Sequence, residues 1–176
     1  MLNLEGNRIY LRALEMGDLD FLYALENNTD LWEISGTTTP YSKKVLQLYL
    51  ESAHRDIYDV KQLRLCICTK EKEVVGLIDL FDFDPKNKKA GIGIVVLQKE
   101  HRNEGIGAEA IAILCDYAFT VLDLHQLYAN VLEDNMASIH LFKKLDFKQI
   151  GVKKDWIYSS GNYKNEILFQ KISTCI

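Results

Sequence analysis

Residues 90–121 constrain the fold of this chain more than any other segment. Residues 90–97 are apolar on both faces, which is typical of a strand buried within a sheet. A polar loop follows, and Gly105 and Gly107 open a run whose apolar residues recur at helical spacing. The segment predicts a buried strand, a loop and an amphipathic helix. The unpaired N–H groups and positive dipole end at such a helix start bind phosphates without a particular side chain.

The rest of the chain alternates between the two-residue period of strands and the 3.6-residue period of helices. Strand patterns cover residues 8–13, 63–67, 74–81, 126–132, 147–157 and 163–172, and helical patterns cover 18–27, 136–145 and a stretch from the N-cap Ser42 to about residue 55. Turns are expected at residues 84–87 and at Gly161-Asn162. This order predicts one α/β (α+β) domain over residues 1–176, with a mixed central sheet of about seven strands flanked by about four helices.

Charge is unevenly distributed along the sequence. The 176 residues carry 21 Lys+Arg against 25 Asp+Glu, which gives a net charge of −4 with neutral histidines. Residues 1–60 alone carry −5, and the remaining 116 residues carry +1. A mildly acidic balance argues against a protein whose main role is to bind nucleic acid phosphates. The acidic first third is the feature that a function must explain.

The cysteines and histidines show no metal-ligand spacing, so no metal site is expected. Cys66 and Cys68 lie two apart in an alternating strand, and with Cys115 and Cys175 they are expected to be small buried residues in a reducing cytoplasm. Charged residues appear too early for a signal peptide, and no stretch approaches 18 apolar residues. We therefore expect a cytoplasmic protein that does not bind membranes.

Two motifs resemble those of the GNAT superfamily of acyl-CoA-dependent N-acyltransferases. Residues 102–107, Arg-Asn-Glu-Gly-Ile-Gly, match the family's pyrophosphate loop, Arg/Gln-x-x-Gly-x-Gly/Ala, at every fixed position. Residues 135–147 are similar to the family's Asn-x-x-Ala/Ser-Ile-x-x-Tyr-x-Lys-x-Gly-Phe helix. Residues 3–14, 115–124 and 161–165 resemble one branch, which contains the spermidine/diamine acetyltransferases and the ribosomal-protein N-terminal acetyltransferases. The resemblance covers essentially the whole chain and implies the GNAT fold.

The resemblance implies a set of contacts to acetyl-CoA as co-substrate. Backbone groups of residues 90–97, the fourth strand along the chain, would pair with the pantetheine arm. The loop of residues 102–107 would hold the pyrophosphate, and the helix of residues 136–145 would complete the site. The implied residues are Val95, Val96, Leu97, Arg102, Asn103, Glu104, Gly105, Ile106, Gly107, Asn135, Ser138 and Phe142. Asn135 reads equally well as the N-cap of its helix, and Ser138 as a filler on the first turn.

The sequence departs from the family pattern where the proton donor and base are expected. Acetyl transfer requires a base to accept a proton from the amine and a donor for the leaving thiolate. The Tyr that commonly supplies the donor falls at Phe142, and the fourth-strand Glu of many relatives falls at Gly91. The Gly of the helix motif is Asp146, which tolerates a left-handed conformation.

Three weaker candidates remain for the catalytic groups. Asp79 and Asp82 lie on the third strand, and their spacing of three puts them on opposite faces, so at most one faces the cleft. Each reads also as a solvated or edge charge. Tyr128 on the fifth strand has a hydroxyl to donate, but a buried strand Tyr is more often part of the core.

The acidic N-terminal helices suggest the acceptor site. Asp30, Trp32 and Glu33 combine carboxylates with an aromatic ring, which suits an alkylammonium, although solvated charges are the alternative. We expect an acetyl-CoA-dependent N-acetyltransferase for a polyamine such as spermidine or putrescine. The alternatives are an N-terminal acetyltransferase of a ribosomal protein and a CoA-binding module with little catalysis. The branch also suggests a homodimer or a higher homo-oligomer.

Overall fold

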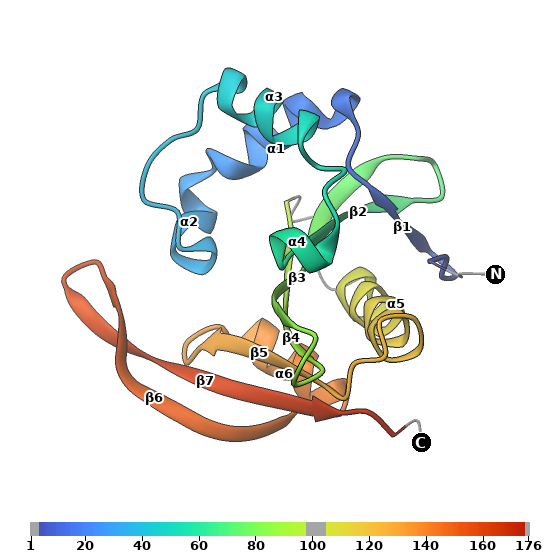
Figure 1. The fold of residues 1–176 in the computed structure, drawn as a ribbon. Coiled ribbons are helices and arrows are strands. Elements are labelled where there is room, and N and C mark those ends of the chain that lie inside the picture. The colour runs from blue at the N-terminus through green and yellow to red at the C-terminus, as the bar shows by residue number, and fades with distance from the viewer. Residues whose placement is uncertain (1–3, 98–104, 175–176) are drawn as a thin grey trace.

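The structure is a computed structural model that describes residues 4–97 and 105–174. Its elements run in the order β1 (Ile9–Ala13), a 3-10 turn η1 (Met16–Asp18), α1 (Leu19–Glu26), α2 (Thr29–Ser35), α3 (Lys43–Glu51), α4 (Ile57–Val60), β2 (Leu63–Thr69), β3 (Val74–Asp84), β4 (Lys89–Val96), α5 (Ile106–Thr120), β5 (Gln126–Leu132), α6 (Met136–Lys144), β6 (Lys148–Ser159) and β7 (Asn162–Ile172) (Figure 1).

The seven strands form one mixed sheet, as the sequence predicts. Their order is β1-β2-β3-β4-β5-β7-β6, and only the β4–β5 pair is parallel. That pair is short, since its register contains three residue pairs and ends at Gly91 opposite Tyr128. The two halves of the sheet, β1–β4 and β5–β7, are therefore joined over a few residues only.

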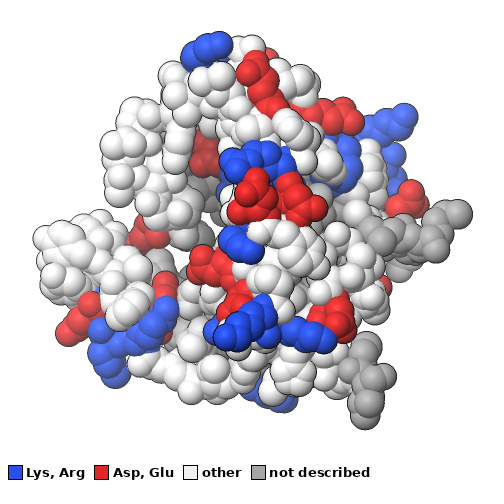
Figure 2. Space-filling view, in the orientation of Figure 1, with Lys and Arg blue, Asp and Glu red and all other residues white. Residues whose placement is uncertain are grey.

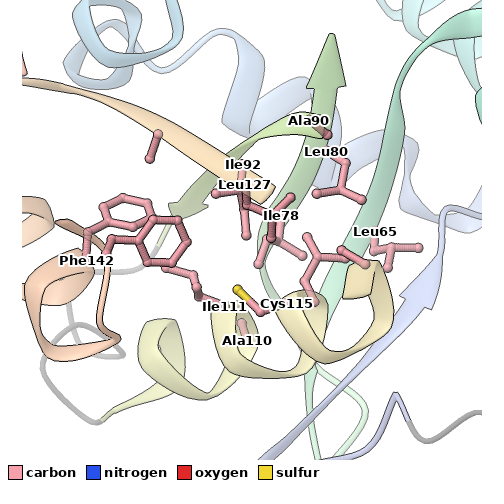
Figure 3. Packing of buried hydrophobic residues seen from close by; sticks show 14 of the residues in the cluster. Leu65, Ile78, Leu80, Ala90, Ile92, Ala110, Ile111, Cys115, Leu127 and Phe142 are labelled. Atoms are coloured by element: carbon pink, nitrogen blue, oxygen red, sulfur yellow. The ribbon is translucent and has the colours of Figure 1, made fainter. Parts of the chain in front are cut away.

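Helices cover the two faces of the β1–β4 half. The amphipathic helix α5 packs on one face, where Ile106, Ala110, Ile111 and Leu114 meet buried strand residues such as Ile78 (Figure 3). On the other face, leucines of α1, α2 and α3 pack on Cys66, Cys68 and Leu77. The β6–β7 hairpin extends away from this body (Figure 1).

Side-chain caps and a left-handed glycine set the helix starts. The Ser42 side chain accepts a hydrogen bond from the N–H of Val45 at 3.2 Å, which confirms the predicted N-cap of α3. Gly105 precedes α5 with φ of 83°, a conformation that a side chain disfavours. The strand–loop–helix order predicted from residues 90–121 is thus confirmed at its helical end.

The three described cysteines are buried, as expected for small apolar residues. Burial raises the pKa of the Cys66 and Cys115 thiols to about 12 in each case, so neither is a thiolate near neutral pH. The Cys66 thiol donates to the Asp18 carboxylate at 3.6 Å, and Arg12 donates to both oxygens of that carboxylate at 2.8 Å. Cys175 lies outside the described residues.

The prediction of about four helices is incomplete, because the described part of the chain contains six α-helices. The two missed helices, α2 and α4, contain seven and four residues, too few to show a clear period. Tertiary contacts hold α2 in place, since Leu31 is buried and the Trp32 indole donates to the carbonyl of Glu26 at 2.8 Å. Helix α3 ends at Glu51, about four residues earlier than predicted.

Two further predictions about strands need correction. The β6–β7 turn lies at Ser160-Gly161, one residue before the predicted position, and both residues have positive φ, which matches the right-handed strand twist. The predicted burial of both faces of residues 90–97 holds for the first part of β4 only. From Gly93 onward the strand is half-buried, because β5 no longer lies beside it.

Candidate active site

A cleft of about 520 Å³ opens where the β4–β5 ladder ends. Its walls come from residues 92–95 of β4, residues 130–132 of β5, the first turns of α6, and α2 with the segment that follows it. Strands that are buried and parallel at one end, and separated at the other, leave room for an extended ligand between them. This position agrees with the general rule that ligands bind beyond the carboxyl ends of parallel strands.

The backbone of β4 presents polar groups to this cleft. The N–H of Leu97 donates to the carbonyl of Val75 on β3 at 3.0 Å. Antiparallel alternation then directs the backbone groups of Val95 toward β3 as well, and those of Val96, Ile94 and Ile92 toward the β5 side. Of the three β4 residues singled out in the sequence, only Val96 therefore turns its backbone toward the cleft side. Ile92 and Ile94, which the sequence did not single out, share this backbone direction with Val96.

The proposed pyrophosphate loop is only partly described. Arg102, Asn103 and Glu104 lie outside the described residues. Gly105 and Ile106 are at the N-terminus of α5, where Gly105 is exposed and Ile106 is buried in the core. A methyl group at Gly107 would lie 3.3 Å from Leu141, so this glycine permits close packing of α5 against α6.

Three residues of α6 and its cap line the cleft together. Asn135 accepts a hydrogen bond from the N–H of Ser138 at 3.1 Å, so the N-cap interpretation of Asn135 is confirmed. Phe142 also lines the cleft but is only 4% exposed. Its ring meets Phe147 edge-on at 5.0 Å and stacks on Phe169 at 6.2 Å between centroids. Phe142 is thus an apolar part of both the core and the cleft wall.

A three-residue ion-pair cluster forms another part of the wall. Arg64 on β2 donates to Asp79 on β3 at 2.7 and 3.2 Å and to Glu26 of α1 at 2.9 Å. The three side chains are 23%, 19% and 13% exposed, respectively. Burial opposes the charge of Arg64, but Asp79 outweighs it and raises the pKa of the guanidinium.

Of the candidates for catalysis, only Asp79 is brought to the cleft lining. Arg64 and Glu26 were not predicted from the sequence to be part of the site. The register that places Arg64 directly opposite Asp79 is a tertiary fact, and the alternating pattern of β2 alone does not contain it.

Asp82 and Tyr128 form a separate pair that is not among the cleft-lining residues. The Tyr128 hydroxyl donates to Asp82 at 3.2 Å, and burial together with the Asp82 charge raises the pKa of Tyr128 to about 12. Between them and the cleft, the Phe81 ring covers Gly91. A Cβ at Gly91 would lie 2.2 Å from this ring, so the glutamate that many relatives carry there does not fit beside Phe81.

The predicted acceptor residues gather around a second, shallower pocket of about 610 Å³ between α2 and the β6–β7 hairpin. Figure 2 shows a notch in the surface between these two parts of the molecule. Asp30, Trp32 and Glu33 all line this pocket, and Glu33 lines the main cleft as well. Lys164 of β7 donates to Glu33 at 2.7 Å, and hydrogen bonds from Lys164 and Ser159 lower the pKa of Glu33.

An interrupted parallel strand pair with a helix N-terminus beside it provides a slot for an extended acyl carrier, which is the architecture of acyl-CoA-dependent acetyltransferases. The family comparison agrees, because residues 8–148 match the Acetyltransferase (GNAT) domain, and the chain belongs to this family. It is an N-acetyltransferase that uses acetyl-CoA as its co-substrate.

The most similar relatives include spermidine acetyltransferases. Spermidine N(1)-acetyltransferase of Escherichia coli strain K12 is 31% identical over 163 residues, which cover 92% of this chain and 84% of the relative. The enzyme of the same name from Vibrio cholerae is 28% identical over 162 residues, covering 91% and 90% of the two chains. A crystal structure of the Vibrio cholerae spermidine N-acetyltransferase with CoA and spermine superposes with a TM-score of 0.84 at 27% identity and covers 93% of this chain and 95% of that one.

The structure describes residues 4–97 and 105–174, and two absences hold for these ranges. Within these ranges no group of three or more His, Cys, Asp and Glu side chains is arranged to hold a metal ion. No helix in the same ranges is long and apolar enough to cross a membrane.

Proposed function

We propose that this N-acetyltransferase transfers the acetyl group to a primary amine of a polyamine such as spermidine or putrescine, with residues 1–176 acting as one domain. The observation that carries the proposal is the charge of the cleft. Its lining contains four carboxylates, those of Glu26, Glu33, Asp79 and Glu166, and one cationic side chain, Arg64. Lys164 and Lys153 pair with Glu33 and Glu166 from outside the lining, so these seven side chains together carry a net charge of −1, and a wall with this small excess of negative charge favours a cation. The spermidine acetyltransferases among the relatives support the same acceptor class.

The chain's own groups suit the binding of acetyl-CoA. Beyond the end of the β4–β5 ladder, the backbone of Ile94 is directed away from β3 and would pair with an extended pantetheine arm, in the way that an added strand pairs with a sheet edge. The N-terminus of α5, with the loop of residues 102–107, would bind the pyrophosphate. Asn135 and Ser138 would border the arm from the opposite wall.

In this proposal Asp79 is the carboxylate that accepts the proton of the attacking amine, directly or through a water molecule. An ammonium has no lone pair for attack, so the cleft must both attract the cation and remove its proton. Arg64 holds Asp79 by two hydrogen bonds and thereby orients the carboxylate. Holding the amine beside the thioester lowers the barrier through proximity.

The test is an assay of free thiol with acetyl-CoA and a panel of amines. We expect thiol release with spermidine and putrescine to exceed that with peptides bearing the N-termini of ribosomal proteins. Faster turnover of the peptides would replace the polyamine with a protein N-terminus as acceptor. Release no greater than background with every amine would refute acetyl transfer to amines by this chain.

A CoA-binding module with little catalysis is the second candidate, and the burial of Phe142 favours it. A phenylalanine cannot donate a proton to the thiolate, and Phe81 leaves no room for a carboxylate at Gly91. This candidate predicts acetyl-CoA binding in calorimetry without turnover. Phe142→Tyr separates the two, because a missing donor predicts a faster thiol release by the variant, and an unchanged rate means that the donor lies elsewhere.

Assembly into a homo-oligomer forms part of the proposal. A dodecameric structure of the Vibrio cholerae spermidine N-acetyltransferase, 29% identical to this chain with a TM-score of 0.77, supports it. Sedimentation of the purified protein tests it, and a monomer at micromolar concentration would contradict it.

A further inference from the structure

One lysine joins three parts of the molecule that are far apart in the sequence. The ammonium of Lys164, on β7, lies 2.7 Å from Glu33 of α2 and 2.6 Å from Asp134, in the turn between β5 and α6. Lys164 and Glu33 line the shallow pocket between α2 and the hairpin, and Glu33 also lines the main cleft. An alkylammonium therefore sits between two carboxylates beside the cleft.

Neither carboxylate depends on Lys164 for its position. The turn that carries Asp134 is fixed by Glu133 and Asn165, whose side chains and backbones exchange three hydrogen bonds of 2.8 to 3.1 Å. Helix α2, which carries Glu33, is anchored on α1 by the buried Leu31 and the Trp32 indole. Lys164 is thus a cation held between two elements that other contacts already hold.

We propose that Lys164 is a specificity-determining residue of the acceptor site, because its ammonium occupies the place between Glu33 and Asp134 that a second ammonium of a polyamine takes. The inference rests on the proposed polyamine function. An acceptor with one ammonium must bring that group to the acetyl donor and leaves the Glu33–Asp134 pair to Lys164. A polyamine has a further ammonium, which competes with Lys164 for the two carboxylates.

The strength of the resident contacts makes this exchange feasible. All three side chains are partly exposed, at 25% for Lys164, 34% for Glu33 and 54% for Asp134. Exposed ion pairs contribute little to stability, so a dissolved polyamine displaces the lysine at a small cost. Removal of Lys164 should tighten polyamine binding by about 3- to 10-fold, which corresponds to the loss of two such weak pairs.

The experiment measures spermidine and butylamine binding to the full chain by titration calorimetry, with no need for turnover. We expect Lys164→Met to bind spermidine about 3- to 10-fold more tightly than the native protein and to change the butylamine affinity by less than about twofold. Lys164→Gln, which keeps hydrogen-bond donors without the charge, should behave in the same way. Lys43→Met is the matched control, since Lys43 forms an exposed pair with Asp20 at 2.7 Å and lines neither pocket.

Adding Glu33→Gln to Lys164→Met should abolish the gain in spermidine affinity, because one of the two carboxylates that would bind the second ammonium is then neutral. An equal gain in spermidine affinity in the Lys43 variant would mean that the loss of any positive charge causes the effect, and this result would overturn the proposal. So would unchanged or weaker spermidine binding in both Lys164 variants, or a gain that survives Glu33→Gln. The thiol assay is separate, so a native protein that binds spermidine without thiol release refutes the proposed function and leaves this binding test decisive.

Discussion

Replacement of Arg64 by methionine should destabilise the protein more than any other single charge removal in the cleft wall. Arg64 pairs with both Asp79 and Glu26, with three hydrogen bonds of 2.7 to 3.2 Å, and each of the three side chains is less than a quarter exposed. The substitution keeps most of the apolar volume but leaves two mostly covered carboxylates without their cation.

The magnitude follows from this burial. Breaking a fully buried ion pair costs about 3–5 kcal/mol, and the residual exposure here lowers that to about 2–4 kcal/mol. In a chain of this size each kcal/mol lowers the melting temperature by about 2–4 °C, so the expected loss is about 4–16 °C. Further substitution of Glu26→Gln and Asp79→Asn should recover about half of the loss, since no charge then remains buried without a partner.

The assay is thermal unfolding followed by circular dichroism at neutral pH. Arg55→Met is the matched control, because Arg55 pairs with Asp59 at 2.7 Å but the two side chains are 53% and 62% exposed. The control should lose less than about 0.5 kcal/mol. If Arg64→Met loses no more stability than Arg55→Met, or if neutralising the two carboxylates lowers the melting temperature further, then unpaired buried carboxylates do not destabilise the variant.

The remaining predictions concern the packing of Gly91 against Phe81, the N-cap of α6 and stability at acid pH. Gly91→Ala should cost about 1–3 kcal/mol in urea denaturation, because its Cβ meets an aromatic ring, whereas Gly151→Ala has open space and should cost less than about 0.5 kcal/mol. Asn135→Ala and Ser42→Ala should each cost about 1 kcal/mol as lost N-caps, but only the former should weaken acetyl-CoA binding in calorimetry. Burial opposes the charge of Asp18, yet the guanidinium bonded to it lowers the pKa of Asp18 below its usual value. This contribution is present above the unfolded pKa of about 3.9 and is lost as pH falls below it, so melting temperatures of native protein and Asp18→Asn should converge from pH 6 to pH 3.

Local patterns predicted the elements whose physics is local. Strand β5 has the predicted bounds, and the Ser42 cap is where the sequence placed it, since a side chain that bonds the next turn needs no distant partner. Helix α2 was missed because its seven residues depend on α1 for anchoring. The hairpin turn was displaced by one residue because either Ser160-Gly161 or Gly161-Asn162 offers residues that accept positive φ.

In the candidate site, too, local features were predicted from the sequence and features that depend on tertiary contacts were not. Motifs with fixed spacing indicated the cap of α6 and the start of α5. Strand register, by contrast, decides that Arg64 faces Asp79 and that Phe81 covers Gly91, and chain folding brings Lys164 to Glu33. Such contacts join residues that are 10 to 131 positions apart, and a single sequence without the fold does not reveal them.

The short β4–β5 ladder has a mechanical consequence. Three residue pairs, ending at Gly91 and Tyr128, join a four-stranded leaf to a three-stranded leaf. A rotation of β5–β7 relative to β1–β4 about these three residue pairs changes the width of the cleft and leaves the longer ladders within each half intact. A rotation between the two halves strains few sheet hydrogen bonds, so amide exchange should be faster along the β4–β5 pair than along the longer β2–β3 ladder.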